Sequence, residues 1–337
     1  MYPCFPTKYE DTFFPTSTPA STMDPTLFHA LPLPSAEDEG SERLWQVLRG
    51  FESCFGRSPA GAARAPGRVN LIGEHVDYEG YAVLPMAIEQ SIYVAFGVAK
   101  LATEGENESV GGGVKLLSVA NAKPQYKAVT VSMEESEKEI METLERQETS
   151  WAKYVLCGVL GIRDAYSELF QGSDVELQML VDGDIPAGCG LSSSSALVVA
   201  SALATTSALK TPMHKPLSRA ELAELCRQAE HRVGTMGGGM DQAVACLAQR
   251  GVALHLDFSS LPAKSSLVNV PDATAGVTFV VANSLVVAQK AVDAAIRFNK
   301  RVVECAIAAK LIAKKANVEN WRNVSVDPRV VHPVWQC

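Results

Sequence analysis

Residues 183–204, GDIPAGCGLSSSSALVVASALA, place four consecutive serines between a glycine-containing loop and an apolar run with the composition of a buried helix. Serine is a poor helix former in the interior but is favoured at helix N-termini. The preceding residues, ELQMLVDGDIP, have the pattern of a strand and its exit loop. A loop between a strand and a helix N-terminus favours anions, because free backbone N–H groups and the helix dipole meet there. We therefore predict a phosphate site at these serines.

The residue types in this loop suit a nucleotide phosphate. Gly188 and Gly190 let the backbone approach closely, and serine hydroxyls add donors and a ligand for Mg²⁺. The sequence has no G-x-x-x-x-G-K-[ST] pattern, so the loop is not a Walker loop. A capped core helix with a flexible lead-in is the alternative at this stage.

A second polar segment, residues 65–87, reads APGRVNLIGEHVDYEGYAVLPMA. Its strand delivers Arg68, and the following turn offers Glu74, His75 and Asp77. Carboxylates and an imidazole clustered on a loop suit the paired hydroxyls of a sugar. The alternative is a set of exposed turn residues with an ion pair to Arg68.

Composition excludes several function classes. A net charge of −8 and a pI near 5.4 argue against a nucleic-acid partner. The eight cysteines form no Cys-x-x-Cys pair and fit reduced thiols. No apolar run reaches the ~18 residues of a membrane span, and no signal-peptide pattern opens the chain. We expect a cytoplasmic monomer without nucleic-acid or membrane partners, and 337 residues predict two domains.

Local patterns predict most of the elements. Residues 1–40 are rich in Pro, Ser and Thr and predict a disordered leader. Helices are expected at 41–56 with Leu44, Val47, Leu48 and Phe51 inward, at 134–148 with a solvated acidic face, and at 151–170, 222–233, 240–248 and 289–315. Strands are expected at 68–73, 81–88, 91–99, 174–183, 252–258 and 278–284. Ser218 and Glu221 form a capping box, and Val302, Val303, Ala306 and Leu311 are expected to face inward from the last helix.

The two polar segments resemble known motifs. Residues 65–87 resemble the galactokinase signature, and residues 183–204 resemble the second, ATP-binding motif of the GHMP kinase superfamily. The resemblance runs from about Arg64 to about Ala316 and implies a two-lobed α+β fold that binds nucleotide and sugar between its lobes. Within the family the chain is most similar to the N-acetylgalactosamine kinases, through YAVLPMAIEQ, GLSSSSALV, LAELC, GGGMDQ, VANS and FNKRVVEC.

This resemblance implies a role for each matching residue. Arg68 lies near the transferring phosphoryl group, and Asp241 of GGGMDQ is the catalytic aspartate beside the anomeric hydroxyl. The sugar hydroxyls contact Glu74, His75 and Asp77. The residues implied for ATP are Gly190, Ser192, Ser193, Ser194, Asn283, Ser284 and Trp151, and those implied for Mg²⁺ are Ser194 and Glu230. A solvated helix position for Glu230 and a core position for Trp151 are the alternatives.

The implied activity is an ATP-dependent sugar 1-kinase acting on galactose, N-acetylgalactosamine or both. One alternative is a non-catalytic sugar and ATP sensor, against which the presence of Arg68 and Asp241 speaks. Another is a kinase for mevalonate or homoserine, against which GEHVDY speaks. Because Phe298 and Asn299 stand where galactokinases usually have a tyrosine near the sugar, we expect N-acetylgalactosamine to be favoured.

Members of the family continue well beyond residue 337 and carry a third, glycine-rich motif there. The resemblance therefore implies an N-terminal lobe at 41–272 and, at 273–337, the start of an incomplete C-terminal lobe. We expect apolar side chains such as Val280, Val281 and Leu311 to lack partners, and the chain as written to be poorly soluble or inactive.

Overall fold

The computed structural model describes residues 42–101, 113–171, 174–209, 217–260, 262–271, 276–285, 299–315 and 317. The predicted leader and Phe298 lie outside these residues. The described part is mixed α and β, as predicted. The boundary between an N-terminal and a C-terminal lobe at residue 272 stays a prediction. No helix within it is both long and apolar enough to cross a membrane.

A five-stranded sheet forms the centre of the molecule. Its strands are β1 (Gly61–Asn70), β2 (Pro85–Lys100), β3 (Val114–Asn121), β4 (Val129–Ser132) and β5 (Val175–Gly183), in the order β1-β2-β5-β3-β4. The β3–β5 pair is parallel and the other pairs are antiparallel. Our prediction of separate strands at 81–88 and 91–99 is wrong, because β2 is one strand that stays paired with β1 across a register shift between Pro66 and Arg68. Residues 81–84 precede β2, and Val83 forms an isolated bridge to Leu256 while Leu84 exchanges backbone hydrogen bonds with Leu71 and Ile72.

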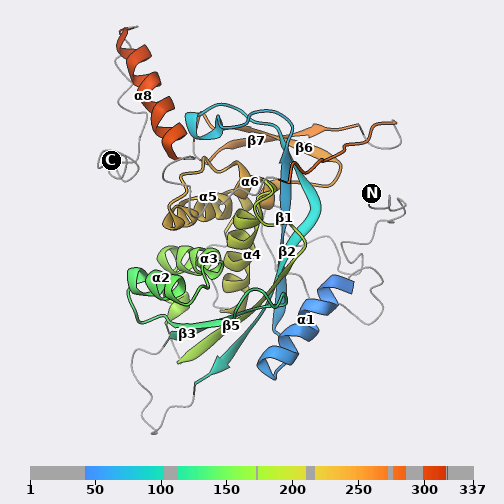
Figure 1. The fold of residues 1–337 in the computed structure, drawn as a ribbon, viewed down its shortest axis with the longest axis vertical. Coiled ribbons are helices and arrows are strands. Elements are labelled where there is room, and N and C mark those ends of the chain that lie inside the picture. The colour runs from blue at the N-terminus through green and yellow to red at the C-terminus, as the bar shows by residue number, and fades with distance from the viewer. Residues whose placement is uncertain are drawn as a thin grey trace.

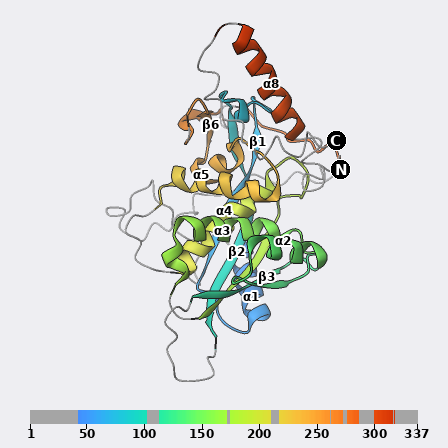
Figure 2. The same cartoon turned by 90° about the vertical axis from the view of Figure 1, so that its left-hand side faces the viewer.

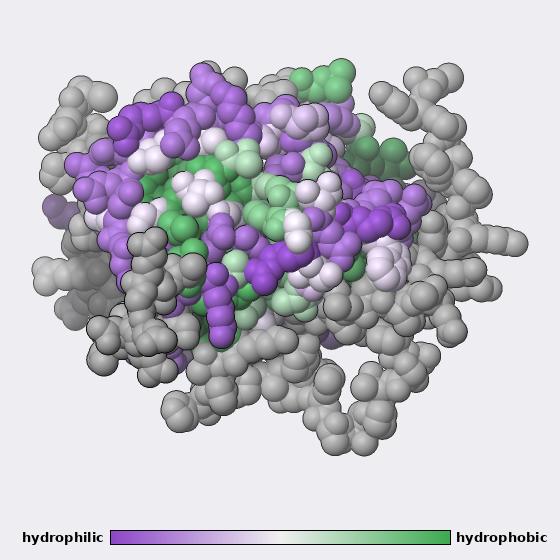
Figure 3. Space-filling model, turned by 90° about the horizontal axis from the view of Figure 1, so that it is seen from below, coloured by the Kyte–Doolittle hydropathy of each residue, from purple (hydrophilic) through white to green (hydrophobic). Residues whose placement is uncertain are grey.

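Helices cover both faces of this sheet. Helix α1 (Glu42–Phe55) packs on one face through the four predicted residues, in a cluster with Tyr93 and Leu180. The other face carries α3 (Ala152–Ala165), α4 (Ser193–Ala208), α5 (Arg219–Glu230) and α6 (Met240–Leu247). Figures 1 and 2 show α1 apart from these helices. Figure 3 views the molecule of Figure 1 from below and shows apolar residues surrounded by hydrophilic ones on that face.

Two helices start at capping boxes, and two end earlier than predicted. Capping boxes start α2 (Glu137–Arg146) at Ser136 and α5 at Ser218. Helix α2 buries Ile140 and Leu144, so it is more than a solvated acidic surface. The helices expected at 151–170 and 222–233 each end early and continue as short 3₁₀ turns, η2 (Ser167–Phe170) and η3 (His231–Val233).

The chain after residue 251 differs most from expectation. Strands β6 (Val252–Asp257) and β7 (Lys264–Asn269) form a hairpin, of which β7 was not predicted. The strand expected at 278–284 is wrong, because no described strand pairs with this segment and Val280 is 86% exposed. In α8 (Asn299–Lys315), Val303 and Ala306 are buried as predicted, whereas Val302 is only partly buried and Leu311 is 63% exposed, because α8 lies at one end of the molecule (Figure 1). The exposure of Val280, Val281 and Leu311 agrees with the expectation that these side chains lack partners within the described residues.

Helix α4 is buried on nearly all sides, which requires close neighbours. Its residues from Ser195 to Thr205 are all buried, and α3 crosses it at Gly158. A Cβ at Gly158 would lie 2.5 Å from the Val198 carbonyl oxygen and 2.7 Å from the Ala202 nitrogen. The absence of a side chain at Gly158 therefore sets the distance between the two helices.

We predict that Gly158→Ala destabilises the protein by about 1 to 3 kcal/mol, because the added methyl group meets backbone atoms that cannot rotate away. Denaturant unfolding measures this change. Gly237→Ala is the matched control, since a Cβ there meets nothing within 4 Å. Equal stabilities of the two variants would contradict the proposed packing constraint.

Candidate active site

A cavity of about 210 Å³ lies beside the N-termini of α4 and α6 and the C-terminus of α5. It brings together segments that are far apart in the sequence: the end of β1, the turn η1 (Asp77–Glu79), the loop of residues 184–192 before α4, here called the serine loop, and the glycine loop of residues 237–239 before α6. Of the predicted site residues, those that line it are Arg68, Glu74, His75, Asp77, Gly190, Ser194, Glu230 and Asp241.

An ion pair between Arg68 and Asp241 crosses this cavity. The Arg68 Nε donates to Asp241 Oδ1 at 2.7 Å, and its Nη1 donates to the Gly190 carbonyl at 2.6 Å. The two side chains are only 9% and 18% exposed. Our alternative of an ion pair between Arg68 and the 74–77 turn is wrong, because the guanidinium faces α6 and the serine loop.

The serine loop is not a capped lead-in. Helix α4 begins at Ser193, and Ser192 before it has a left-handed backbone (φ 61°) and makes no side-chain capping bond. Its hydroxyl is buried and has no hydrogen-bond partner in the described part of the chain. Gly190, which lines the cavity, is also left-handed (φ 74°). A loop with an unsatisfied hydroxyl at a helix N-terminus fits a bound phosphate.

Glu230 is a buried carboxylate at the end of α5, only 6% exposed, so the solvated alternative is wrong. Gln242 Nε2 donates to its Oε2 at 2.6 Å. Burial raises the pKa of the Glu230 carboxyl, and the nearby Asp241 charge adds to this, whereas hydrogen bonds with Ser195, Ser194 and Gln242 lower it. Oxygen donors of this kind fit Mg²⁺. Among the described residues, no group of three or more His, Cys, Asp and Glu side chains is arranged to hold a metal ion.

The 74–79 turn supplies a second group of polar side chains. Asp77 Oδ2 accepts from the Met240 backbone nitrogen at 3.4 Å, next to Asp241 in sequence. Burial raises the pKa of Asp77, and the Asp241 charge raises it further. His75 is left-handed (φ 60°), and its Nδ1 lies 3.0 Å from the Tyr78 hydroxyl. The turn therefore presents carboxylates and an imidazole to one cavity wall.

Five residues predicted for the nucleotide lie outside the cavity lining: Ser192 and Ser193 of the serine run, and Trp151, Asn283 and Ser284. The Trp151 indole nitrogen donates to the Lys127 carbonyl at 3.1 Å, and the Trp151 ring lies beside the Tyr126 ring in a tilted arrangement. Asn283 Nδ2 lies 3.4 Å from Cys189 Sγ, and so sits against the serine loop with Ser284 next to it in sequence. Their roles in nucleotide binding stay predictions.

Several lining residues were missed by sequence reasoning. Arg227 pairs with both oxygens of Glu224, at 2.6 and 2.9 Å, and lies one helical turn before His231. The other missed residues are Tyr78, Tyr154, Ser195, His231, Thr235, Gly237, Gly239, Met240 and Gln242. A signal existed for two of them, because Gln242 follows Asp241 directly and Ser195 ends the serine run.

Comparison with known proteins assigns the family. The family model for the galactokinase galactose-binding signature matches residues 49–98, and that for the GHMP kinases N terminal domain matches residues 153–249. The galactokinase of Candida maltosa is 31% identical over 223 residues, which cover 66% of this chain and 92% of that relative. The chain belongs to the galactokinase family.

Other relatives of this galactokinase-family chain are longer. The galactokinase of Dictyostelium discoideum is 36% identical over 290 residues, which cover 85% of this chain and 52% of that protein. The chain thus spans about half the length of this relative and of the galactokinase of Schizosaccharomyces pombe, of which it covers 54%. The crystal structure of Lactococcus lactis galactokinase complexed with galactose is similar in fold, with a TM-score of 0.52, 24% identity, and coverage of 68% of this chain and 52% of that one.

We predict that Asp77→Asn stabilises the ligand-free protein at neutral pH by about 1 kcal/mol, as commonly found when a site residue is relieved of unfavourable charge. The folded-state pKa of Asp77 is raised, so its ionisation opposes folding at neutral pH. The gain should vanish as the pH falls below the unfolded pKa, where the carboxyl is neutral in both states. Melting temperatures across this range, with exposed Glu74→Gln as control, test the prediction. A gain that persists at low pH, or a loss at neutral pH, would contradict it.

Proposed function

We propose that this protein is an ATP-dependent sugar 1-kinase, which transfers the γ-phosphoryl group of ATP to the anomeric hydroxyl of galactose and yields galactose 1-phosphate and ADP. The observation that carries the proposal is the Arg68–Asp241 ion pair, in which Arg68 contacts both the Gly190 carbonyl of the serine loop and the first turn of α6. Asp77 of the sugar-side turn accepts from Met240 in the same turn of α6, so both groups of residues line one cavity. The family match to a galactose-binding signature at 49–98 supports galactose as the acceptor.

Phosphoryl transfer depends mainly on positioning and on stabilisation of charge. In the proposed reaction the Asp241 carboxylate orients the anomeric hydroxyl and accepts its proton. Arg68, held between Asp241 and the Gly190 carbonyl, faces the phosphoryl group and stabilises its charge. The hydroxyls of Ser192 and Ser194 and the backbone N–H of Ser193 bind the phosphates, and Glu74, His75 and Asp77 bind the sugar.

Ser194 and Glu230 are the residues that would hold Mg²⁺, which neutralises phosphate charge when bound. Their fit rests on the buried Glu230 carboxylate and on its hydrogen bonds with Ser194 and Ser195. Trp151, Asn283 and Ser284 are proposed on the nucleotide side, where Asn283 already contacts the serine loop. A monomeric state and a cytoplasmic location stay predictions.

A finer proposal concerns the choice of sugar. Asn299 donates to the Gly234 carbonyl at 2.7 Å and accepts from the Met236 nitrogen at 3.1 Å, so it fixes the loop that precedes Asp241. We keep the prediction that N-acetylgalactosamine is accepted and favoured over galactose, by about 1 to 3 kcal/mol in transition-state binding. Specificity constants for both sugars test it, and a clear preference for galactose would overturn it.

The proposed activity itself is tested with an ADP-release assay on galactose, N-acetylgalactosamine, mevalonate and homoserine. Because we expect the chain as written to be poorly soluble or inactive by itself, the assay uses the chain extended by the C-terminal lobe of a longer relative. Turnover of either sugar and none of the other acceptors is expected. Binding of galactose and ATP without turnover would instead favour a sensor. Turnover of mevalonate or homoserine would contradict the sugar assignment.

We predict that Asp241→Asn lowers kcat by roughly 10²- to 10⁴-fold, because it removes the proton acceptor and the partner of Arg68. Galactose affinity, measured by calorimetry, should change little, since the sugar keeps Glu74, His75 and Asp77. Asp257→Asn, on β6 outside the cavity lining, is the matched control. Near-normal turnover of Asp241→Asn would exclude the assigned role.

A further inference from the structure

The serine loop is held at both of its ends. At its far end, the Arg68 backbone nitrogen donates to the Leu191 carbonyl at 3.2 Å, which ties the loop to β1. At its near end, where β5 stops, Asp184 begins the loop. Its backbone nitrogen donates to the Ser91 carbonyl at 3.2 Å, and its Oδ1 accepts from the Ser91 nitrogen at 2.7 Å. The loop therefore starts from a fixed point on β2.

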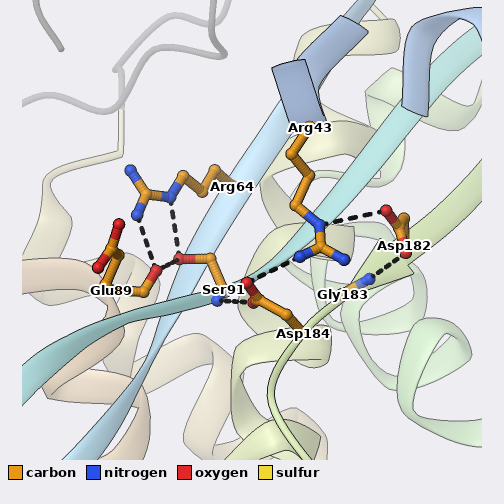
Figure 4. Close-up of polar contacts among 7 residues, drawn as sticks. All are labelled: Arg43, Arg64, Glu89, Ser91, Asp182, Gly183 and Asp184. Carbon is orange, nitrogen blue, oxygen red and sulfur yellow. Dashed lines mark hydrogen bonds and ion pairs between the residues drawn. The ribbon is translucent and has the colours of Figure 1, made fainter. Parts of the chain in front are cut away.

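One arginine from the opposite face of the sheet reaches this fixed point. Arg43, in the first turn of α1, lies between two carboxylates that flank Gly183 (Figure 4). Its Nη1 lies 2.8 Å from Asp184 Oδ2, and its Nε lies 3.3 Å from Asp182 Oδ2. Asp182 is nearly buried, at 10% side-chain exposure, and its Oδ1 accepts from the Gly183 nitrogen at 2.7 Å. Arg43 thus joins the last residues of β5 to the first residue of the loop.

A second arginine holds the β2 side of the same junction. The Nε of Arg64 donates to the Ser91 hydroxyl at 2.9 Å, and its Nη2 donates to the Glu89 carbonyl at 3.1 Å (Figure 4). The Ser91 hydroxyl in turn donates to the Glu89 carbonyl at 2.8 Å. Charged hydrogen bonds that converge on one backbone segment fix it more firmly than a single exposed ion pair does.

From this geometry we infer that Arg43 is a positioning residue for phosphoryl transfer, which acts through Asp184 to hold the serine loop in place for the phosphates of ATP. The inference rests on the proposed function. Helix α1 does not need Arg43 to pack, because Leu44, Val47, Leu48 and Phe51 bury its apolar face. The side chain is therefore available for orienting the loop, and small displacements of binding groups strongly reduce rates of transfer.

The test compares Arg43→Met, Arg43→Lys and the control Arg49→Met, which alters an exposed arginine of the same helix. We expect Arg43→Met to raise KM for ATP roughly fivefold, the upper range for a partly exposed ion pair, while KM for galactose changes by less than about twofold. Arg43→Lys should recover part of the loss, and Arg49→Met should behave like the wild type. A double variant with Asp184→Asn should add little to the effect of Arg43→Met on KM for ATP, since the contact between Arg43 and Asp184 is already lost in Arg43→Met.

Hydrogen exchange of the amides at 185–192 gives a readout that needs no activity. Faster exchange there in Arg43→Met, with unchanged exchange in α1 and an unchanged melting temperature, supports the inference. Unchanged exchange at 185–192, or equal changes in both KM values together with a lower melting temperature, overturns it. If the wild type shows neither turnover nor ATP binding, the proposed function fails, and the exchange comparison alone still decides whether Arg43 holds the loop.

Discussion

The burial of α4 is the constraint on which the rest of the structure depends. Its residues from Ser195 to Thr205 pack against the sheet on one side and against α3, α5 and α6 on the other. A helix enclosed on all sides has a fixed axis, so the position of its N-terminus is fixed as well. Ser192, Ser193 and Ser194 are placed by the core of the protein and not by the loop alone.

The negative charges of the cavity carboxylates are offset by individual contacts and not by an equal number of positive side chains. Asp77, Glu230 and Asp241 lie close enough that the Asp241 charge raises the pKa of each of the other two. Arg68 pairs with Asp241, while Glu230 depends on hydroxyl and amide donors. Because these carboxylates repel one another, they lower the stability of the folded protein. The same carboxylates favour cationic or hydroxyl-bearing ligands, and such a conflict between stability and binding is common at functional sites.

Local signals and distant contacts explain what sequence reasoning could and could not predict. The cap at Ser218 and the apolar stripe of α1 act within one or two helical turns, and the predictions from them are confirmed. The equally local capping box at Ser136 was not predicted. The continuity of β2 depends on its pairing with β1. Residues 278–284 form no strand because no described strand pairs with them. Neither outcome can be predicted from the residues of the segment alone. In the candidate site, Arg68 and Asp241 could be predicted because they belong to recognisable motifs. Arg227 and Tyr154 line the cavity only because of how their helices pack, which the sequence motifs do not indicate.

The order of strands has a consequence for how the chain is made. Strand β2 forms a hairpin with its neighbour β1, but its other edge pairs with β5, which begins only at Val175. During synthesis this edge stays open until β5 has left the ribosome, and an open, apolar strand edge invites pairing with other chains. The Arg68–Asp241 contact spans 173 residues, so it closes later still. During synthesis, the open edge of the central sheet must therefore be protected from pairing with other chains before the residues of the candidate site come together.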